Sequence, residues 1–352
     1  MSPGFSDLIG DPLFQLNMVL WLAQPLPEAA PITPLFHERG FDVYAIAPLL
    51  PIPPDVLLAA TDTHLAIQSG VRPDVVLVNL EESKYAFTEC KKSAFGPASS
   101  TADQARSLLL LAGPRSHEIL GLVPGQVSKA LLEYMVPENA VQPLGLSLEV
   151  LQRDLRERSF PTGDYCVFGI SLNENNLSLT VDQVGGTFFN IAPGQNPFME
   201  REPDTDPRPL YFIPFDPDVE QSKDEKTLCK RILFERMHSA ILAAVGHANP
   251  PCELTLQCHQ ILNDATFGMY EHWENKDSAR NMRRLCRQFV GDLQKSVNSI
   301  STDAMTFRSP QGWQLSLPDQ ARHERVIEVL TRFCSESLEL GLDPKPELFD
   351  DL

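Results

Sequence analysis

Residues 71–93 constrain the fold of this chain more than any other stretch. Two runs, VVLVNL and YAFTECKKS, are separated by the polar tetrapeptide EESK at residues 81–84. Apolar runs that flank a short polar loop are typical of a β-hairpin. The runs are apolar on both faces, which is typical of strands in the centre of a sheet. The stretch therefore predicts a buried hairpin.

Three charged residues stand in this hairpin, with Asp74 before the first run and Glu89 and Lys91 within the second. Because Glu89 and Lys91 are two residues apart in a strand, their side chains leave the same face. A four-residue loop at 81–84 places Asp74 opposite Lys91, whereas a two-residue loop at 81–82 places Asp74 opposite Glu89. Either register brings the three side chains together, since opposed positions have Cβ atoms roughly 4.5 to 5.5 Å apart.

A divalent cation is the expected occupant of this cluster. Two neighbouring carboxylates in an apolar strand would repel each other unless a hard cation lay between them. Mg²⁺ is expected, with Mn²⁺ as a substitute, and the carbonyl of Cys90 is a candidate further oxygen ligand beside Asp74 and Glu89. A bound divalent ion can offset charge on a phosphate, activate water and stabilise the leaving oxygen. Lys91 can orient the water or neutralise the developing charge, so the cluster suits phosphodiester hydrolysis.

The spacing of these residues resembles a known signature. The motif RPD at residues 72–74 is followed, after 14 intervening residues, by the motif ECK at residues 89–91. This pattern resembles the PD-(D/E)xK nuclease superfamily, whose signature lies on a hairpin followed by a helix. The resemblance covers about residues 60–125. It implies an α/β fold of the restriction-endonuclease-like kind, with a mixed sheet flanked by helices.

The resemblance also implies roles for individual residues. Asp74 and Glu89 correspond to the metal ligands of the superfamily, and Lys91 corresponds to the lysine that assists water attack. Gln104 resembles a polar position that some members place beside the site. Members often take an extra acidic ligand from the first helix, and Glu38 is the candidate for it.

Two domains are expected from the length of 352 residues, because one ordinary domain holds about 100 to 200. Residues 1–215 are predicted to form the nuclease-like domain with a proline-rich N-terminal segment. Residues 222–352 are predicted to form a helical domain for recognition, assembly or partner binding. Predicted strands outside the hairpin cover residues 42–47, 118–123, 164–171, 177–184 and 209–214. Predicted helices cover residues 13–23, 100–112 with Ser100 or Thr101 as the cap, 127–135, 143–158, 222–246, 253–273, 278–297 and 319–340, and residues 194–208 are predicted to be an exposed loop.

The net charge of −18 argues against a protein that coats nucleic acid by itself, since such binding replaces counterions with Lys and Arg. The densest basic patch is Arg280, Arg283, Arg284 and Arg287, which helical spacing places largely on one side. We interpret it as a DNA-binding surface, and the alternative is a solvated face paired with local acids such as Asp277. Because the patch is small, we expect the protein to need self-assembly or a partner, either an ATPase or helicase or a sensor protein.

The location expected for the chain is the cytoplasm. Its seven cysteines include no CxxC pair and do not resemble a disulfide framework. Cys252, Cys258 and His259, with His247 or His272, are a candidate metal cluster, but the Cys-x5-Cys spacing matches no ordinary zinc knuckle, so we interpret these cysteines as core residues. The apolar stretch 13–23 is shorter than the ~20 residues that span a bilayer, so no membrane association is expected.

These residues together predict a magnesium-dependent nuclease that hydrolyses DNA, and the superfamily resemblance suggests restriction or anti-phage defence as its setting. One alternative is a degenerate nuclease fold that acts as a structural or regulatory subunit of a nucleic-acid-processing complex. The presence of all three polar residues counts against it. RNA is a second possible substrate. The sequence contains neither GxxxxGK nor GxGxxG, so it shows no NTPase motor of its own.

Overall fold

The structure is a computed structural model of the chain. It describes residues 9–26, 32–123, 125–172, 176–200, 223–309 and 312–340. These residues form two compact units. The first contains the described residues up to 200 together with His272–Asn275, and the second contains the other described residues from 223 onwards. Within these ranges, no helix is both long enough and apolar enough to cross a membrane.

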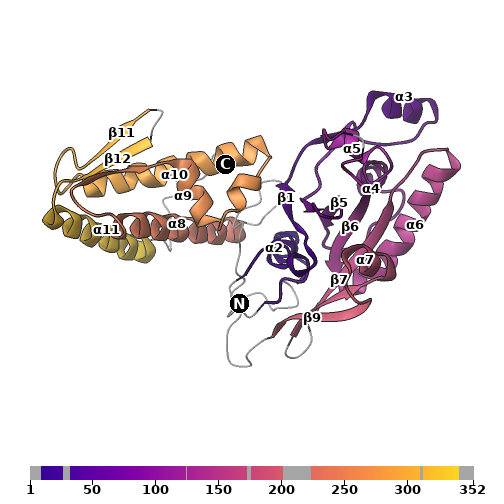
Figure 1. Cartoon of the computed structure of the whole chain (residues 1–352), viewed down its shortest axis with the longest axis horizontal. Helices are drawn as coiled ribbons and strands as arrows, with labels where there is room; N and C mark the ends of the chain where they lie inside the picture. The colour runs from indigo at the N-terminus through magenta and orange to yellow at the C-terminus, as the bar shows by residue number, and fades with distance from the viewer. Residues whose placement is uncertain are drawn as a thin grey trace. The chain divides into compact units, whose positions relative to one another are not determined.

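The first unit contains a seven-stranded sheet (Figure 1). In spatial order its strands are β1 (Asp42–Ile46), β4 (Val75–Asn79), β5 (Lys84–Cys90), β6 (Lys129–Pro137), β7 (Asp164–Leu172), β8 (Asn176–Val181) and β9 (Gly194–Glu200). Strands β5, β6 and β7 run parallel, and the other neighbours run antiparallel. Two short strands, β2 (Leu50–Pro51) and β3 (Gly70–Val71), form a separate ribbon.

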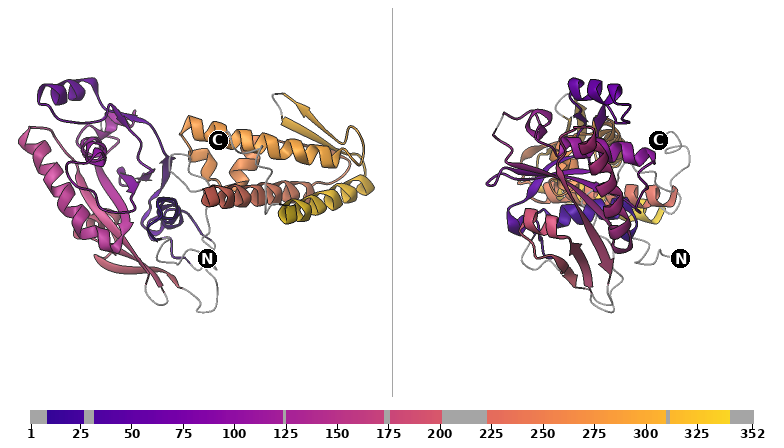
Figure 2. Two further views of the ribbon diagram at one scale, coloured as in Figure 1. Left: turned by 180° about the vertical axis from the view of Figure 1, so that it is seen from behind. Right: turned by 90° about the vertical axis from the view of Figure 1, so that its right-hand side faces the viewer.

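Helices cover both faces of this sheet. The helices of the first unit are α2 (Pro12–Leu22), α3 (Pro54–Asp62), α4 (Ser100–Leu111), α5 (Ser116–Ile119), α6 (Val141–Glu157) and α7 (Gln183–Phe189), with short 3₁₀ segments at His37–Arg39 and Glu138–Ala140. Helices α4 and α6 lie on one face, whereas α2 packs against β5 and β6 on the other (Figures 1 and 2). The first unit is therefore an α/β fold with a mixed sheet flanked by helices.

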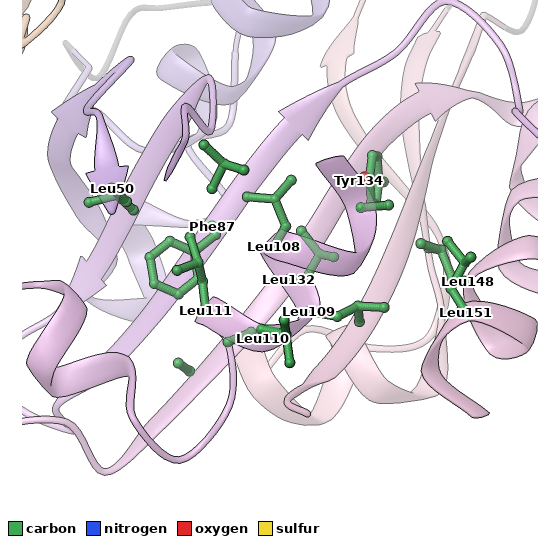
Figure 3. Packing of buried hydrophobic residues seen from close by; sticks show 14 of the residues in the cluster. Leu50, Phe87, Leu108, Leu109, Leu110, Leu111, Leu132, Tyr134, Leu148 and Leu151 are labelled. Atoms are coloured by element: carbon green, nitrogen blue, oxygen red, sulfur yellow. The ribbon is translucent and has the colours of Figure 1, made fainter. Parts of the chain in front are cut away.

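A cluster of buried hydrophobic residues fills the space between the sheet and helices α4 and α6 (Figure 3). Phe87 of β5 and Leu132 of β6 point into it, and Leu108 and Leu148 of the two helices meet them. All four side chains are fully buried. Since strand side chains alternate between faces, the odd-numbered residues of β5 and the even-numbered residues of β6 lie on the α4 face.

The start of α4 is fixed by a side-chain cap. Ser99 Oγ accepts a hydrogen bond of 3.3 Å from the Ala102 amide. The predicted cap, Ser100 or Thr101, was wrong by one or two positions, because several neighbouring hydroxyl residues satisfy the same cap pattern. The helix itself is confirmed.

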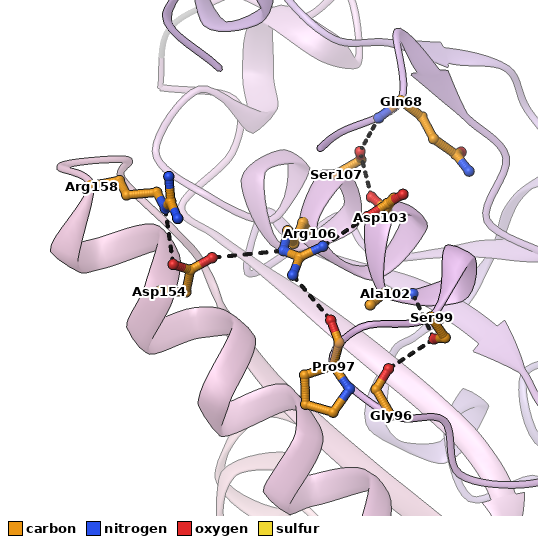
Figure 4. A network of polar contacts seen from close by, with 10 residues as sticks. All are labelled: Gln68, Gly96, Pro97, Ser99, Ala102, Asp103, Arg106, Ser107, Asp154 and Arg158. Atoms are coloured by element: carbon orange, nitrogen blue, oxygen red, sulfur yellow. Dashed lines mark hydrogen bonds and ion pairs between the residues drawn. The ribbon is translucent and has the colours of Figure 1, made fainter. Parts of the chain in front are cut away.

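A polar network ties α4 to α6 (Figure 4). Arg106 donates to Asp103 over 2.7 Å and to the carbonyl of Pro97 over 3.1 Å, and its Nε lies 3.8 Å from Asp154 of α6. The Arg106 side chain is only 15% exposed, so these contacts are shielded more than a surface ion pair. The network holds the first turns of α4 in place, including Gln104.

Two elements of the first unit differ from the sequence prediction. Residues 127–135 were predicted as a helix, but residues 129–135 lie in β6, whose residues Ala130 to Val136 are all buried. The segment is rich in alanine, leucine, glutamate and methionine, which favour helices. A parallel strand that is buried on both faces can have the same continuous apolar run, so the composition led to the wrong prediction. Residues 118–123 were predicted as a strand but contain the end of α5 and a turn. Short apolar runs do not distinguish the two states.

The predicted loop at residues 194–208 is also partly wrong. Residues 194–200 form β9, which pairs with β8 at the edge of the sheet. Pro197 is tolerated there because an edge strand can lack one ladder donor. The rest of that loop and the predicted strand at residues 209–214 lie outside the described residues.

The second unit combines helices with a small sheet. Its elements are α8 (Lys223–Gly246), β10 (Cys252–Leu256), α9 (Cys258–Ala265), the 3₁₀ segment Met269–His272, α10 (Lys276–Val297), β11 (Met305–Arg308), β12 (Gly312–Leu317) and α11 (Gln320–Leu340). The three strands form an antiparallel sheet in the order β10-β12-β11. The predicted helix at residues 253–273 was therefore wrong, and the predicted helical domain also contains a small sheet that the sequence reasoning did not expect. In β10 exposed and at least partly buried residues alternate, but a run of only five residues does not separate this period reliably from a helical one.

Candidate active site

The β4–β5 hairpin sets the geometry of the candidate site. Val75 pairs with Thr88, and Asn79 pairs with Lys84, so the loop spans residues 80–83. Continued by one residue, this register places Asp74 opposite Glu89. Of the two registers considered from the sequence, the one that opposes these carboxylates is the one observed.

Asp74 and Glu89 belong to the same face of the sheet. Val76 and Val78 lie in the cluster beneath α4, and Asp74 has their parity along the chain. One Asp74 carboxylate oxygen, Oδ2, accepts a hydrogen bond of 2.6 Å from the Cys90 amide. Asp74 is therefore held against the end of β5.

Glu89, Lys91 and Gln104 form one hydrogen-bonded group. Lys91 Nζ lies 2.5 Å from Glu89 Oε1 and 3.3 Å from Gln104 Oε1. Gln104 Nε2 donates to the same Glu89 oxygen over 2.9 Å. Gln104 extends from α4 and the other two from the end of β5, so the helix and the hairpin together position the group. The predicted proximity of Gln104 to Glu89 and Lys91 is thus observed.

Burial and charge set the protonation of this group. Glu89 is 2% exposed, and burial raises its pKa, while the nearby Lys91 ammonium and Gln104 amide act in the opposite direction. Burial alone would lower the pKa of Lys91, but the carboxylates of Glu89 and Asp74 outweigh it and raise that pKa. Lys91 is therefore an ammonium at neutral pH and offers positive charge rather than a basic lone pair.

Cys90 offers only its main chain to this site. Its side chain has the parity of Thr88, on the opposite face from Glu89, and it is buried. Burial, and next the charge of Asp74, raise the pKa of the Cys90 thiol well above its usual value. Because an apolar environment suppresses the thiolate, the carbonyl oxygen is the only ligand atom that Cys90 can supply here.

Sequence reasoning missed two residues beside the site. Gln15 of α2 donates from Nε2 to the carbonyls of Lys91 over 3.1 Å and of Ile9 over 2.8 Å, and so fixes the backbone at Lys91. The only signal for it was an amide in a helix whose other residues, apart from Asn17, are apolar. Tyr134 of β6 pairs with Glu89 in the parallel register. Its buried hydroxyl has no hydrogen-bond partner among the described residues. Sequence reasoning missed Tyr134 because residues 127–135 were predicted as a helix.

Glu38, the proposed extra acidic ligand, lies elsewhere. It is exposed in the 3₁₀ segment His37–Arg39, where its amide donates to the Pro34 carbonyl. The helix that does reach the site is α2, and it brings the Gln15 amide rather than a carboxylate. Glu38 therefore does not supply the extra acidic ligand that the resemblance to the superfamily implied.

The donor set of the site suits magnesium. Within the described ranges, no group of three or more His, Cys, Asp and Glu side chains could hold a metal ion. Mg²⁺, however, retains several waters and is usually bound through only one or two carboxylates. Among the residues that the structure describes, none donates a hydrogen bond to the buried Glu89 Oε2, a costly condition that a cation beside it would relieve. Asp74, Glu89 and the Cys90 carbonyl therefore fit such an ion.

The predicted basic patch lies on α10 in the second unit. Arg280, Arg283, Arg284 and Arg287 are all exposed. Arg280 pairs with Asp277 over 3.1 Å, in a contact whose two side chains are 75% and 80% exposed. Such exposed ion pairs contribute little to stability. Pairing with a local acid, the alternative considered from the sequence, is therefore observed at Arg280, and the patch remains exposed to solvent.

No family model, curated protein or solved structure matches this chain.

Proposed function

We propose that the chain is a magnesium-dependent nuclease of the PD-(D/E)xK type that hydrolyses DNA. The observation that carries the proposal is the group formed by Asp74, Glu89 and Lys91 at one end of a central hairpin. In this group the Lys91 ammonium contacts the Glu89 carboxylate, Gln104 contacts both Glu89 and Lys91, and the Asp74 carboxylate accepts from the amide of Cys90 between them. The hairpin followed by α4 is also the arrangement on which the superfamily carries its signature, which supports a restriction-endonuclease-like fold for the first unit.

Each residue has a role in this proposal. Asp74 and Glu89, with the Cys90 carbonyl, would hold Mg²⁺, which supplies Lewis-acid stabilisation of phosphate charge and a source of nucleophilic water. Lys91 remains protonated and neutralises charge that develops on the phosphate. Gln104 keeps the Lys91 ammonium and the Glu89 carboxylate in a fixed geometry.

The proposal is tested by incubating the purified full-length protein with supercoiled plasmid, linear duplex, single-stranded DNA and RNA. Each substrate is assayed with Mg²⁺, with Mn²⁺ and with chelator. We expect metal-dependent cleavage of DNA that chelator abolishes. Cleavage of RNA alone would change the substrate class. No cleavage of any substrate would favour the alternative of a degenerate fold in a regulatory subunit.

Replacing Asp74 with asparagine is expected to weaken Mn²⁺ binding at least about tenfold, because even residues that only support metal ligands alter affinity by about 10- to 100-fold. Asparagine keeps an oxygen that can accept from the Cys90 amide, so the hairpin geometry is preserved. Isothermal titration calorimetry measures the affinity. Asp62→Asn, which removes the same charge from an exposed position on α3, is the matched control. Equal affinity in both variants would place the ion elsewhere.

The arginine patch on α10 is proposed to contact DNA phosphates. Neutralising Arg283 and Arg284 is expected to lower the slope of log affinity against log salt by about 2, since each phosphate contact contributes about 0.9. DNA of different sequences should be affected alike. Arg322→Gln with Arg325→Gln on α11 removes the same charge from another helix of the unit and should leave the slope unchanged. An unaltered slope in the Arg283 and Arg284 variant would refute the proposal that this patch contacts DNA phosphates.

The net charge of −18 opposes approach to DNA. We therefore propose that efficient cleavage requires self-assembly or a partner such as a DNA-translocating ATPase, a helicase or a sensor protein, and that the setting is restriction or anti-phage defence. Tight, salt-resistant DNA binding by the isolated monomer would contradict the need for a partner.

A further inference from the structure

Tyr134 of β6 carries a buried hydroxyl that its own packing does not explain. The side chain is fully buried in the cluster beneath α4 (Figure 3), and none of the described residues forms a hydrogen bond with its hydroxyl. The ring packs against Phe95, with the two ring centroids 5.8 Å apart. Phenylalanine at this position would keep that contact without burying a polar atom, and burying an unpartnered hydroxyl costs free energy. The hydroxyl therefore indicates a ligand that the described chain does not itself supply.

The parallel register of β5 and β6 places Tyr134 beside Glu89. The two residues are paired, and the pairing continues beyond β5, where the Lys91 amide donates to the Met135 carbonyl over 3.0 Å. Paired residues of neighbouring strands project from the same face, and the strands lie roughly 4.8 Å apart. Tyr134 and Glu89 thus project side by side toward α4, from which Gln104 reaches Glu89.

Two unpartnered polar atoms therefore lie at adjacent positions on one face of the sheet. Neither Glu89 Oε2 nor the Tyr134 hydroxyl has a hydrogen-bond partner among the described residues, and they do not bond to each other. An ionised carboxylate oxygen only accepts, whereas a tyrosine hydroxyl both donates and accepts. A hydrated Mg²⁺ ion satisfies both atoms, because it binds a carboxylate oxygen and retains several waters that can donate hydrogen bonds.

The surroundings of the Tyr134 hydroxyl keep it protonated. Burial, and next the charges of Glu89 and Asp74, raise the pKa of Tyr134 well above its usual value. A neutral hydroxyl adds no charge to a site that already contains two carboxylates and an ammonium. It can therefore orient a water without competing with the carboxylates for the ion.

We propose that Tyr134 is a positioning residue of the metal centre, and that its hydroxyl accepts a hydrogen bond from a water of the ion's hydration shell. The proposal rests on the proposed function, because it concerns the same ion that Asp74 and Glu89 would hold. The hydroxyl acts through that water and restricts the orientation of the hydrated ion beside Glu89. Full burial favours this role over contact with DNA, because a phosphodiester cannot reach a side chain that is 0% exposed.

Replacing Tyr134 with phenylalanine tests the proposal, because the change removes one oxygen and keeps the ring. Titration calorimetry of the full-length protein with Mn²⁺ should show an affinity about 10- to 100-fold below that of the wild type, the effect of losing a residue that supports a metal centre through hydrogen bonds. In chelator, the urea midpoint should be unchanged or higher, because the variant no longer buries an unpartnered hydroxyl. A purely structural hydroxyl would give the reverse, a lower midpoint with unchanged affinity.

Tyr165→Phe is the matched control. Tyr165 lies on the next strand, β7, and its hydroxyl donates to the Gly145 carbonyl over 3.3 Å. Removing this oxygen should leave the Mn²⁺ affinity unchanged. It should lower the urea midpoint slightly, because a hydrogen bond within the protein is lost.

Cleavage provides a second measurement that separates positioning from folding. In Tyr134→Phe, the Mg²⁺ concentration that gives half-maximal plasmid cleavage should rise about 10- to 100-fold, in step with the loss of affinity. The rate at saturating Mg²⁺ should change much less. A lower rate at saturating Mg²⁺ with an unaltered Mg²⁺ requirement would contradict the proposal.

The possible outcomes distinguish this inference from the proposed function. If Asp74→Asn weakens Mn²⁺ binding but Tyr134→Phe does not, the proposed function stands and the role of Tyr134 is overturned. A lower midpoint of Tyr134→Phe in chelator would overturn that role too, because the hydroxyl would then have a partner in the metal-free protein. Absence of Mn²⁺ binding by the wild type would overturn the proposed function, and with it any role of Tyr134 at the ion.

Discussion

Replacing Lys91 with methionine is expected to lower the single-turnover rate of plasmid cleavage by about 100- to 1,000-fold, the effect of removing one preorganised donor to a developing oxyanion. Methionine retains the length of the side chain but carries no charge. The loss should therefore come from the ammonium, which lies 2.5 Å from Glu89. The same variant should lower the free energy of unfolding by roughly 3 kcal/mol, because it leaves a buried carboxylate without its cation.

A double variant separates catalysis from stability. Adding Glu89→Gln to Lys91→Met removes the uncompensated charge, so urea unfolding should show stability restored to within about 1 kcal/mol of the wild type. Cleavage should remain absent, since both the ammonium and a metal ligand are gone. If restored stability brought back cleavage, Lys91 would be only a structural partner of Glu89. Wild-type cleavage by the single variant would remove Lys91 from the mechanism.

The hairpin and α4 were predictable because their signals are local. An apolar run, a short polar loop and a second run suffice for the hairpin, and hydroxyl residues before leucines suffice for the helix. Proximity of Gln104 to the site followed from its place in the first turns of α4 and from the superfamily resemblance. Glu89 and Lys91 share a face through the two-residue period of the strand alone.

The rest of the site depended on contacts distant in sequence. Gln15 reaches the Lys91 carbonyl across 76 positions of the chain, and Tyr134 becomes a neighbour of Glu89 only through the parallel register of β5 and β6. A parallel strand has no turn that fixes its register, because its connection passes through other elements. The composition of β6 favours a helix, and only burial on both faces overrides that preference.

Glu133 of β6 is expected to make the stability of the protein depend strongly on pH. It lies on the opposite face of the sheet from Glu89. It is fully buried, and it accepts a hydrogen bond of 2.7 Å from Thr88. Burial raises the pKa of Glu133 to about 8. Between pH 4.5 and 8 the folded state therefore holds a proton that the unfolded state has lost, so this residue makes stability fall as pH rises through that window. The accumulated loss is on the order of 5 kcal/mol.

Glu133→Gln should remove this pH dependence, because a neutral amide oxygen can accept from Thr88 at every pH. Urea unfolding at pH 5, 6.5 and 8 measures the difference between variant and wild type, which cancels the titration of all other groups. We expect near-equal stability at pH 5 and a variant more stable by several kcal/mol at pH 8. Glu138→Gln, the same change at an exposed residue near the end of β6, should show no such trend. A difference that stayed constant with pH would mean that Glu133 is ionised in the folded protein, with its charge offset by a partner other than Thr88.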